Sequence, residues 1–346
     1  MSPIISYLRE NNMNEVYYRF PDTSHYHHVW GSAETLHDIE SLAGKQGFVF
    51  APFEPGGEHP LVLVHTDQEE IASTDSEPVD TATSVLNETD HHAAYQEAFA
   101  KMHAQIDNEK LWKVVLARRS DIELAQPLDV RALFIKACQM YPHQMIALVH
   151  TEATGTWLMA TPELLLGRTG DRWATMALAG TLSTPGPWDD KNMREQAYVA
   201  YYIRNCLLRR CYWVNQKAVR TTMAAKLYHL RTDFEFALSD DAEIVKVLND
   251  LFPTPAVCGM PKERALEVIN DGEHFDRKYY SGFCGPLNLT DTSHPDASLY
   301  VSLRCMQIEG ACCHLYAGGG LLRESDEKTE WRETEKKMET MKAALR

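Results

Sequence analysis

Two charged side chains border apolar segments of the sequence. A charge in such surroundings is unfavourable unless it has an oppositely charged partner or a functional role. Lys113 opens the run KVVLAR, which is typical of a buried strand. Glu163 follows a proline and precedes three leucines in ATPELLLG. A lysine and a glutamate in apolar surroundings suit general base and general acid catalysis, because burial favours the uncharged form of each. The ordinary interpretations are a lysine that extends to solvent from a strand end and a carboxylate at a helix start.

A third carboxylate lies on an apolar helical face. If residues 190–209 form a helix, Glu195 shares one face with Val199, Tyr202, Ile203 and Cys206. A carboxylate on such a stripe costs several kcal/mol unless a cation or hydrogen-bond donors compensate it. The alternatives are therefore a metal ligand and a salt bridge at the end of the stripe.

The last segment expected to be helical, EKTEWRETEKKMETM, has charged residues next to the face that is expected to be buried. Glu330, Glu333 and Lys337 share a face at positions i, i+3 and i+7. An adjoining stripe is expected to pack inward: Trp331, Thr334, Met338 and Met341. An ordinary solvated pair between Glu333 and Lys337 would contribute only about 0.3–0.5 kcal/mol. That pair is the alternative to a functional cluster.

Three further segments contain groups that could bind an anion. Arg304 in YVSLRCMQI is expected on a strand, where its guanidinium can form two parallel hydrogen bonds with a carboxylate. Gly318–Gly320 in AGGGLL and Gly180–Thr181 in ALAGT can present backbone N–H groups to a ligand. The glycine run is no dinucleotide fingerprint, because no βαβ pattern surrounds it.

The elements that must position these residues come in groups. Strands are expected at residues 47–53, 61–65, 113–117, 145–150, 157–160, 299–308 and 311–317. Helices are expected to begin at about residue 91 and to cover residues 130–140, 190–209 and 326–345. Residues 66–90, rich in Asp, Glu, Ser and Thr, are predicted to be an exposed connector. Grouped strands and helices without strict alternation favour an α+β fold.

Composition excludes several classes of protein. The 346 residues include 49 acidic and 34 basic ones, for a net charge of −15, which disfavours nucleic acid and anionic membranes as partners. No apolar run approaches the roughly 18 residues needed to span a bilayer, and no signal peptide is evident. None of the eight cysteines belongs to paired CxxC motifs, so zinc is not expected. Reduced thiols and a cytoplasmic location are the expectation.

Eight ordered segments together resemble the chorismate-utilising enzymes, which include the isochorismate, salicylate, anthranilate and aminodeoxychorismate synthases. They are KVVLAR, TPELLL, LAGT, PTPAVCGMP, FDRKYYSGFCG, YVSLRC, LYAGGG and SDEKTEWRETEKK. The resemblance runs from about residue 110 to the C-terminus. It implies a layered sandwich with large antiparallel sheets flanked by helices. It also implies a single catalytic domain over residues 1–346, with a divergent part at 1–90 and a chorismate-binding part at 91–346.

The resemblance also implies roles for the residues singled out above. Lys113 stands where the family has the lysine that activates water, and Glu163 where it has the general acid. Glu195 and Glu333 correspond to ligands of Mg²⁺, and Glu330 to a nearby acidic position that acts through water. Six positions correspond to substrate contacts: Gly180, Thr181, His229, Arg304, Gly318 and Lys337.

Two positions indicate which branch of the family the chain resembles. Anthranilate synthases typically carry glutamine at the position of Lys113, and aminodeoxychorismate synthases carry a nucleophilic lysine at the position of Ala179. Both differences favour water as the nucleophile. The implied activity is the transfer of the chorismate hydroxyl from ring carbon 4 to carbon 2. Salicylate synthases make the same intermediate and then eliminate pyruvate, and a non-catalytic family subunit is a further alternative.

Other properties of the implied enzyme follow less directly. Departures from the family pattern are Phe252, Gly319 and Met176, where histidine, alanine and glutamate are common. A monomer or weak homodimer is expected, and the sequence leaves a menaquinone or a siderophore pathway open.

Because three glutamates are expected to crowd one site, we also expect the empty cleft to be strongly negative. Mg²⁺ and chorismate should then bind with positive coupling.

Overall fold

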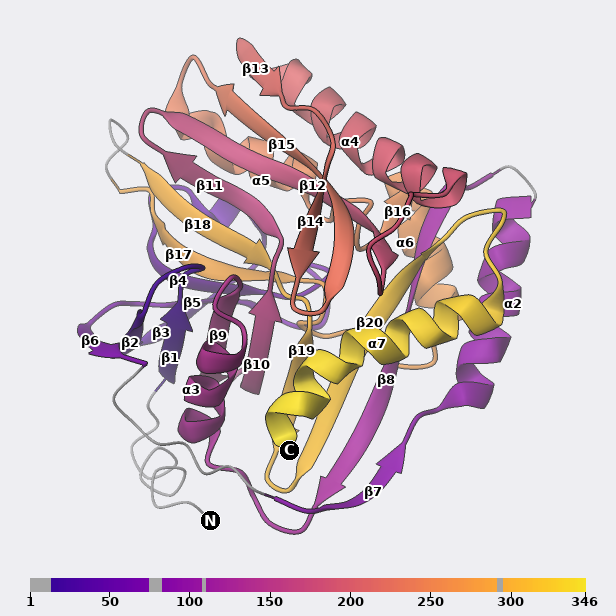
Figure 1. Cartoon of the computed structure of the whole chain (residues 1–346). Helices are drawn as coiled ribbons and strands as arrows, with labels where there is room; N and C mark the ends of the chain where they lie inside the picture. The colour runs from indigo at the N-terminus through magenta and orange to yellow at the C-terminus, as the bar shows by residue number, and fades with distance from the viewer. Residues whose placement is uncertain (1–13, 75–82, 108–109, 291–294) are drawn as a thin grey trace.

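The computed structural model describes residues 14–74, 83–107, 110–290 and 295–346, and its strands form two antiparallel sheets (Figure 1). The first sheet has the order β16 (Gly259–Met260), β8 (Lys113–Leu124), β20 (Cys312–Leu321), β19 (Cys305–Glu309), β10 (Gly155–Thr161), β9 (Met145–Thr151), β1 (Asn14–Arg19), β2 (His25–Gly31) and β6 (Gln68–Ser73), with β7 (Val85–Thr89) beside β8. The second has the order β13 (Trp213–Gln216), β15 (Leu227–Ala237), β12 (Arg172–Leu182), β11 (Leu164–Thr169), β18 (Asp296–Val301), β17 (Phe283–Asn288), β4 (Gln46–Ala51), β5 (Leu61–Val64) and β3 (Ala33–Leu36), with β14 (Arg220–Ala224) beside β15.

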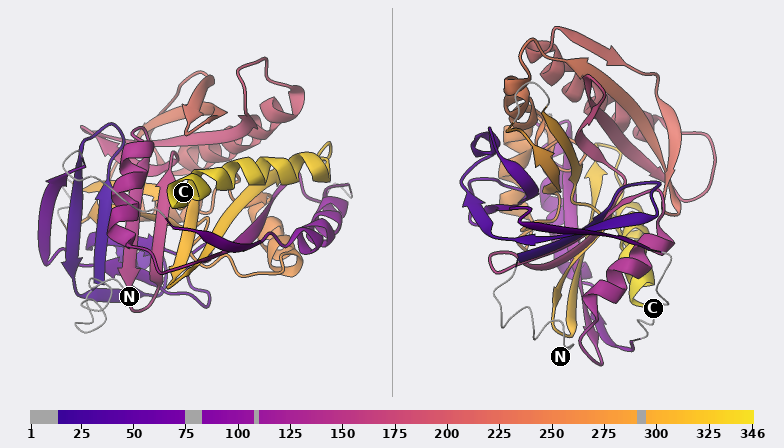
Figure 2. Two further views of the ribbon diagram at one scale, coloured as in Figure 1. Left: turned by 60° about the horizontal axis from the view of Figure 1, so that its bottom comes forward. Right: turned by 90° about the vertical axis from the view of Figure 1, so that its left-hand side faces the viewer.

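Helices cover the outer faces of both sheets (Figures 1 and 2). The described α-helices are α2 (His92–Asp107), α3 (Val130–Met140), α4 (Asp190–Arg210), α5 (Ile244–Leu251), α6 (Lys262–Gly272) and α7 (Glu327–Leu345). On the first sheet, α3 and α7 share one apolar cluster, and α2 and α6 pack together near β8. On the second sheet, α4 and α5 share another cluster. The two sheets therefore lie between layers of helices.

Strand alternation divides the core into layers. In β10, Leu158 and Ala160 face α3 and α7, while Trp157 and Met159 face the second sheet. Successive side chains of a strand point to opposite faces, so one strand can supply two cores. Aromatic rings fill the space between the sheets, where Trp157 stacks on Tyr316 with 5.5 Å between ring centroids. This layer lies directly beneath β20, whose far end carries the glycine run.

Most predicted elements are confirmed. Residues 130–140 form α3, residues 190–210 form α4, and α7 begins after the capping residue Asp326. The predicted strands at 47–53, 61–65, 113–117, 145–150, 157–160 and 311–317 correspond to β4, β5, β8, β9, β10 and β20. Periodicity located these elements because each packs one or both faces against a core.

The prediction that residues 66–90 are only a connector is wrong. The structure forms two strands there, β6 beside β2 and β7 beside β8, and residues 75–82 between them lie outside the described part. Both strands are largely exposed, so the polar composition is explained by their position on the periphery of the sheet. Their backbones are held by ladder hydrogen bonds, which composition does not reveal.

The prediction of one strand over residues 299–308 is also wrong. β18 ends at Val301 in the second sheet and β19 begins at Cys305 in the first. Between them Arg304 has a φ of 47°, in the left-handed region that interrupts a strand. The break lets the chain cross between the sheets, so Arg304 lies at the crossing instead of within a strand.

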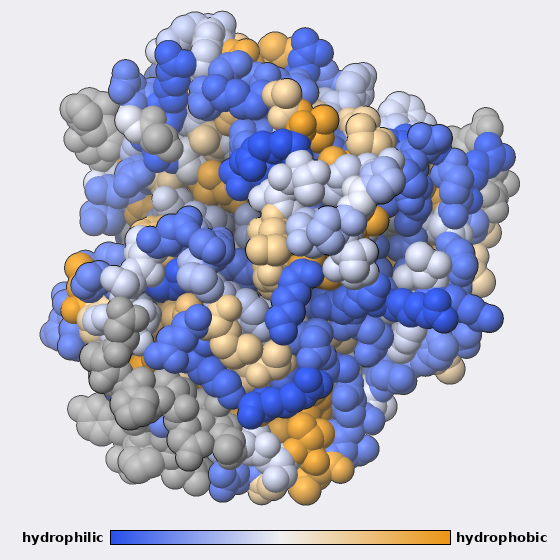
Figure 3. Space-filling model, viewed as in Figure 1, coloured by the Kyte–Doolittle hydropathy of each residue, from blue (hydrophilic) through white to orange (hydrophobic). Residues whose placement is uncertain are grey.

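The expected fold class is confirmed: the chain is α+β, with large antiparallel sheets flanked by helices. Strands from the first 65 residues belong to both sheets, since β1 pairs with β9 and β4 with β17. The face that carries α7 is mainly hydrophilic, with apolar residues in small separate groups (Figure 3). No helix in the described part of the chain is long and apolar enough to cross a membrane.

The layer between the sheets generates a prediction on stability. Trp157 is fully buried and packs against Phe50, Tyr279 and Tyr316. Trp157→Ala should lower the free energy of unfolding by about 3–5 kcal/mol, because it leaves a large cavity. Urea denaturation measures the loss, with the half-exposed Trp112→Ala as the control, for which a change below about 1 kcal/mol is expected. Equal losses in the two variants would contradict this account of the core.

Candidate active site

A cleft of about 620 Å³ opens where the two sheets meet α4 and α7. Nine of the eleven residues predicted for the site line it: Glu163, Gly180, Thr181, Glu195, His229, Arg304, Gly318, Glu333 and Lys337. Of the other two, Lys113 contacts the lining residue Glu195, and Glu330 lies one turn before the lining residue Glu333 on α7. The structure therefore brings together segments that are up to 224 residues apart, between Lys113 and Lys337.

Glu163 is a buried carboxyl group without a paired cation. It lies between β10 and β11 and is only 3% exposed. Burial raises the pKa of Glu163 to about 8, against the opposing effects of Lys113, Arg304 and Lys337. Because the effect of burial is larger than that of the three cations, the carboxyl group is protonated near neutral pH. A protonated carboxyl group can donate its proton to a departing hydroxyl.

Lys113 is fully buried at the start of β8. Its Nζ donates a hydrogen bond of 2.6 Å to the carbonyl oxygen of Pro255 and lies 3.1 Å from Oε1 of Glu195. Glu195 projects from α4 on the expected apolar stripe, since Val199, Ile203 and Cys206 of that stripe are buried. The two contacts fix the amine beside the carboxylate that lines the cleft.

Arg304 and His229 form a hydrogen-bonded pair. His229 Nδ1 donates to the carbonyl oxygen of Gly180 at 2.8 Å, so Nε2 is left to accept from Arg304 Nη2 at 3.0 Å. Burial, with the charges of Arg304 and Lys337, lowers the pKa of His229 to about 3, so the ring is neutral. Arg304 Nε is buried and has no hydrogen-bond partner among the described residues, although Arg304 lines the cleft. The guanidinium is therefore held by a neutral ring and retains an N–H for an anionic ligand.

Three lysines pair one-to-one with the three carboxylates predicted to bind metal. Lys113 pairs with Glu195, Lys337 lies 2.7 Å from Glu333, and Lys191 forms an ion pair with Glu330. The expectation of a strongly negative empty cleft is wrong, because the sequence analysis did not include Lys191. Burying three carboxylates without these cations would cost far more free energy than the paired arrangement does.

The two glutamates that α7 contributes to the cluster have opposite pKa shifts. Burial and the neighbouring charge of Glu333 raise the pKa of Glu330, and Lys191 offsets only part of this. Burial acts to raise the pKa of Glu333 as well, but Lys337, Lys191 and a hydrogen bond from Thr181 together lower it. Of these two glutamates, Glu333 is therefore the one whose charged form is favoured.

The glycine run makes room for side chains. A Cβ on Gly318 would lie 2.9 Å from the hydroxyl oxygen of Tyr280, and one on Gly319 would lie 3.0 Å from Oε2 of Glu330. A Cβ on Gly320 would lie 2.2 Å from Oε1 of Glu195. The three glycines thus admit the side chains of Tyr280, Glu330 and Glu195, and the expectation that their backbone N–H groups approach a ligand stays a prediction.

Sequence analysis missed two residues of this site, Lys191 and Asn192. Asn192 Oδ1 accepts a hydrogen bond of 3.0 Å from the backbone N–H of Thr181, next to Gly180, whose φ is 70°. Lys191 stands four residues before Glu195, on the same face of α4. That spacing was the feature of the sequence that could have pointed to Lys191. A lysine in the first turn of a helix is ordinarily solvated, so the spacing alone did not indicate the site.

The residues present fit Mg²⁺, which prefers oxygen ligands. Glu330 Oε2 and Glu333 Oε1 lie 3.0 Å and 4.0 Å from the position of a Cβ on Gly319, so both face one small space. Glu195 approaches the neighbouring residue Gly320. In the described part of the chain no three acidic, histidine or cysteine side chains are already close enough to hold an ion. Mg²⁺ commonly takes one or two protein carboxylates and fills its other positions with water and substrate oxygens.

Comparison with known proteins identifies the family of the chain. A family model described as chorismate binding enzyme matches residues 61–346. The chain belongs to this family. The family match includes every residue of the cleft and begins within the N-terminal part that the sequence analysis treated as divergent.

Relatives of this chain include isochorismate synthases. Isochorismate synthase MenF of Escherichia coli strain K12 is 30% identical over 248 residues, which are 68% of this chain and 56% of that protein. The vibriobactin-specific isochorismate synthase of Vibrio cholerae is 27% identical over 266 residues, 72% of this chain and 66% of that protein. The chain thus spans between about half and two-thirds of the length of these chorismate-binding relatives.

Solved structures share the fold. The putative 2,3-dihydroxybenzoate-specific isochorismate synthase DhbC of Bacillus anthracis has a TM-score of 0.83 at 24% identity, covering 96% of both chains. Anthranilate synthase component I of Streptococcus pneumoniae has a TM-score of 0.73 at 16% identity, covering 100% of this chain and 98% of that one. The architecture is therefore common to family members with different names.

The crowding at Gly320 generates a prediction. Gly320→Ala should push Glu195 and Lys113 apart, since a Cβ would also lie 2.6 Å from Cε of Lys113. With chorismate as the test substrate for this chorismate-binding family, we expect turnover to fall by roughly 10²-fold, because misplacement by about 1 Å can cost that much. Gly186→Ala, where a Cβ meets open space, should retain normal turnover. Circular dichroism checks that both variants are folded, and an active, folded Gly320→Ala variant would contradict the prediction.

Proposed function

We propose that this protein is an isochorismate synthase, which converts chorismate to isochorismate with Mg²⁺ as cofactor. The observation that carries the proposal is a buried lysine and a protonated carboxyl group at one cleft. Lys113 has the chemistry of a base for water, and Glu163 that of an acid for the departing hydroxyl. The names of the relatives support the same reaction.

Chorismate carries two carboxylates, and the cleft offers cations for them. Arg304 supplies an N–H without a protein partner, on a guanidinium held in place by His229. Lys337 lines the cleft, with its Nζ also donating to the carbonyl oxygen of Gly318 at 2.7 Å. Gly180 and Thr181 contribute a wall of polar backbone and a hydroxyl. These groups orient the ring between Lys113 and Glu163.

The reaction forms one C–O bond and breaks another. Water adds to ring carbon 2 while its proton passes to the amine of Lys113, which can act as a base only after its ammonium proton has left. The two ring double bonds shift, the bond between carbon 4 and its hydroxyl breaks, and Glu163 gives its proton to that hydroxyl, which leaves as water. Ala179, at the place where a lysine nucleophile would stand, leaves the position open to water. Lys113 ends protonated and Glu163 ends as a carboxylate, so the pair must exchange a proton before the next turnover.

Mg²⁺ would be held by Glu333 and Glu195, with Glu330 acting through water. When bound, it supplies positive charge for the ring carboxylate of chorismate. The protein's part is to provide carboxylates that stay charged, and the lowered pKa of Glu333 meets that need.

Product identification from chorismate and Mg²⁺ tests the proposed function. We expect isochorismate, detected by chromatography, and a fall of roughly 10²- to 10⁴-fold in turnover for Lys113→Ala, the usual contribution of a positioned base. A fluorescent aromatic product would instead identify a salicylate synthase. No Mg²⁺-dependent loss of chorismate would exclude both enzymes and favour a non-catalytic family member.

The pH profile tests the role of Glu163. Its pKa is raised to about 8, so the protonated, active form persists up to that pH and is lost above it. We expect turnover to fall about tenfold per unit as the pH rises beyond about 8. Glu163→Gln keeps the shape but cannot give a proton, so its residual activity should lack this alkaline limb. A wild-type profile that stays flat to pH 9.5 would remove Glu163 as the acid.

A further inference from the structure

Lys191 is a buried cation in the middle of the carboxylate cluster. It belongs to the first turn of α4, which begins after the capping residue Asp189. Its ammonium forms an ion pair with Glu330, whose side chain is 1% exposed, while the lysine side chain retains 21% of its exposure. Ser325 donates a second hydrogen bond, of 2.8 Å, to the same oxygen of Glu330. Glu330 thus faces a lysine and a hydroxyl, and both can be replaced by a metal ion or its water.

All three carboxylates of the cluster act on this one ammonium. Glu330, Glu195 and Glu333 each raise the pKa of Lys191, in that order, against the lowering effect of burial. Coulomb interactions of this kind fall off with distance, so the ammonium lies within reach of all three. Glu330 and Glu333 both face the space beside Gly319, and Glu195 and Glu333 line the same cleft, so the ammonium paired with Glu330 lies in the region that the three carboxylates border.

The other two lysines of the cluster are more firmly held. Lys113 also donates to the carbonyl oxygen of Pro255, and Lys337 to that of Gly318. For Lys191 the described residues provide hydrogen bonding through Glu330. Its partly exposed four-carbon side chain can swing toward solvent when Glu330 finds another partner. Among the three lysines, it is the one whose displacement disrupts the fewest contacts.

We propose that Lys191 is the resident cation of the carboxylate cluster, which it neutralises until Mg²⁺ replaces it. This inference rests on the Mg²⁺ dependence of the proposed function. The ammonium keeps Glu330 paired in the metal-free protein, where a buried unpaired carboxylate would be unfavourable. It also repels an arriving divalent ion, so Mg²⁺ alone binds weakly. Tight metal binding then requires chorismate, whose carboxylate adds the negative charge that Lys191 had cancelled.

Calorimetric titration with Mg²⁺ alone tests this role. Lys191→Met removes the charge and keeps much of the side-chain volume, and we expect it to bind Mg²⁺ roughly 10- to 100-fold more tightly than the wild type. Lys191→Arg retains the charge and should bind no more tightly than the wild type. Adding Glu333→Gln to Lys191→Met should abolish the gain, which places the ion in this cluster.

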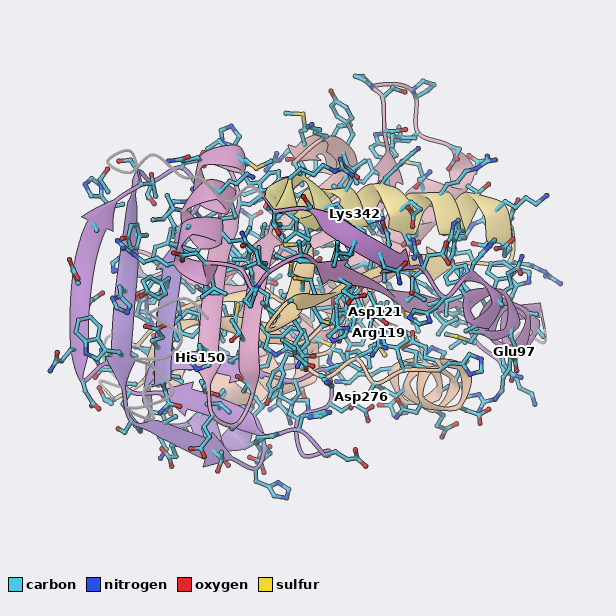
Figure 4. All side chains as sticks on the ribbon, turned by 90° about the horizontal axis from the view of Figure 1, so that it is seen from below. Glu97, Arg119, Asp121, His150, Asp276 and Lys342 are labelled. Atoms are coloured by element: carbon cyan, nitrogen blue, oxygen red, sulfur yellow. The ribbon has the colours of Figure 1, made fainter. Side chains whose placement is uncertain are left out.

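Lys342 of α7 provides a matched control, because it is a similarly buried lysine paired with a glutamate, 2.5 Å from Glu88. It lies about 18 Å along the helix from Glu330 at 1.5 Å per residue, and Figure 4 shows it on α7. Lys342→Met should leave Mg²⁺ affinity unchanged. Thermal melting gives a second readout: metal-free Lys191→Met should melt below the wild type and regain stability in Mg²⁺, whereas Lys342→Met should lose stability that Mg²⁺ does not restore.

Two results would overturn the proposal, and they differ from failure of the proposed function. The first is that the wild type binds Mg²⁺ and Lys191→Met binds it equally or more weakly. Lys191 would then serve only to connect α4 to α7. A gain that survives Glu333→Gln would place the ion elsewhere. If the wild type binds no Mg²⁺ even with chorismate present, the metal dependence itself fails, and with it the basis of this inference.

Discussion

The pairing of buried carboxylates with lysines is the interaction on which the cleft depends. Glu195, Glu330 and Glu333 come from α4 and α7, and each would be costly to bury as an isolated charge. Their lysine partners come from β8, α4 and α7. Two of the three pairs connect different elements, while Lys337–Glu333 lies within α7. Lys191–Glu330 in particular joins α4, which covers the second sheet, to α7, which covers the first. The same lysine–carboxylate pairs thus also hold together the two halves of the molecule that border the cleft.

The backbone around the cleft is shaped to admit these charges. The three glycines of β20 allow Tyr280, Glu330 and Glu195 to approach the sheet more closely than any side chain would permit. The left-handed residue Arg304 carries the chain from one sheet to the other and leaves its guanidinium between them. Backbone conformations that disfavour regular strands are therefore concentrated where the cleft requires space or a crossing.

The sequence predicted the elements and most of the site, and its failures have physical causes. Periodicity located α3, α4 and α7 because each buries one face, and Glu195 was recognisable because a carboxylate interrupts such a face. The break at Arg304 was missed because residues on both sides of it are apolar and suit a strand, while the crossing is a tertiary requirement. Lys191 was missed because its burial depends on α7, 139 residues away. The metal ligands and the catalytic roles remain predictions that the resemblance supplied.

One cleft holds carboxyl groups in opposite protonation states, and their environments explain the difference. Glu163 has three cations nearby but no ion pair, so the effect of burial dominates and the proton stays on. Glu333 is buried too, but Lys337 and Thr181 bond it directly, so the charged form prevails. A general acid must hold a proton at neutral pH and a Mg²⁺ ligand must not. Because direct pairing, more than burial, separates the two states, any residue that repositions a lysine in this cluster also changes which carboxyl group can give a proton.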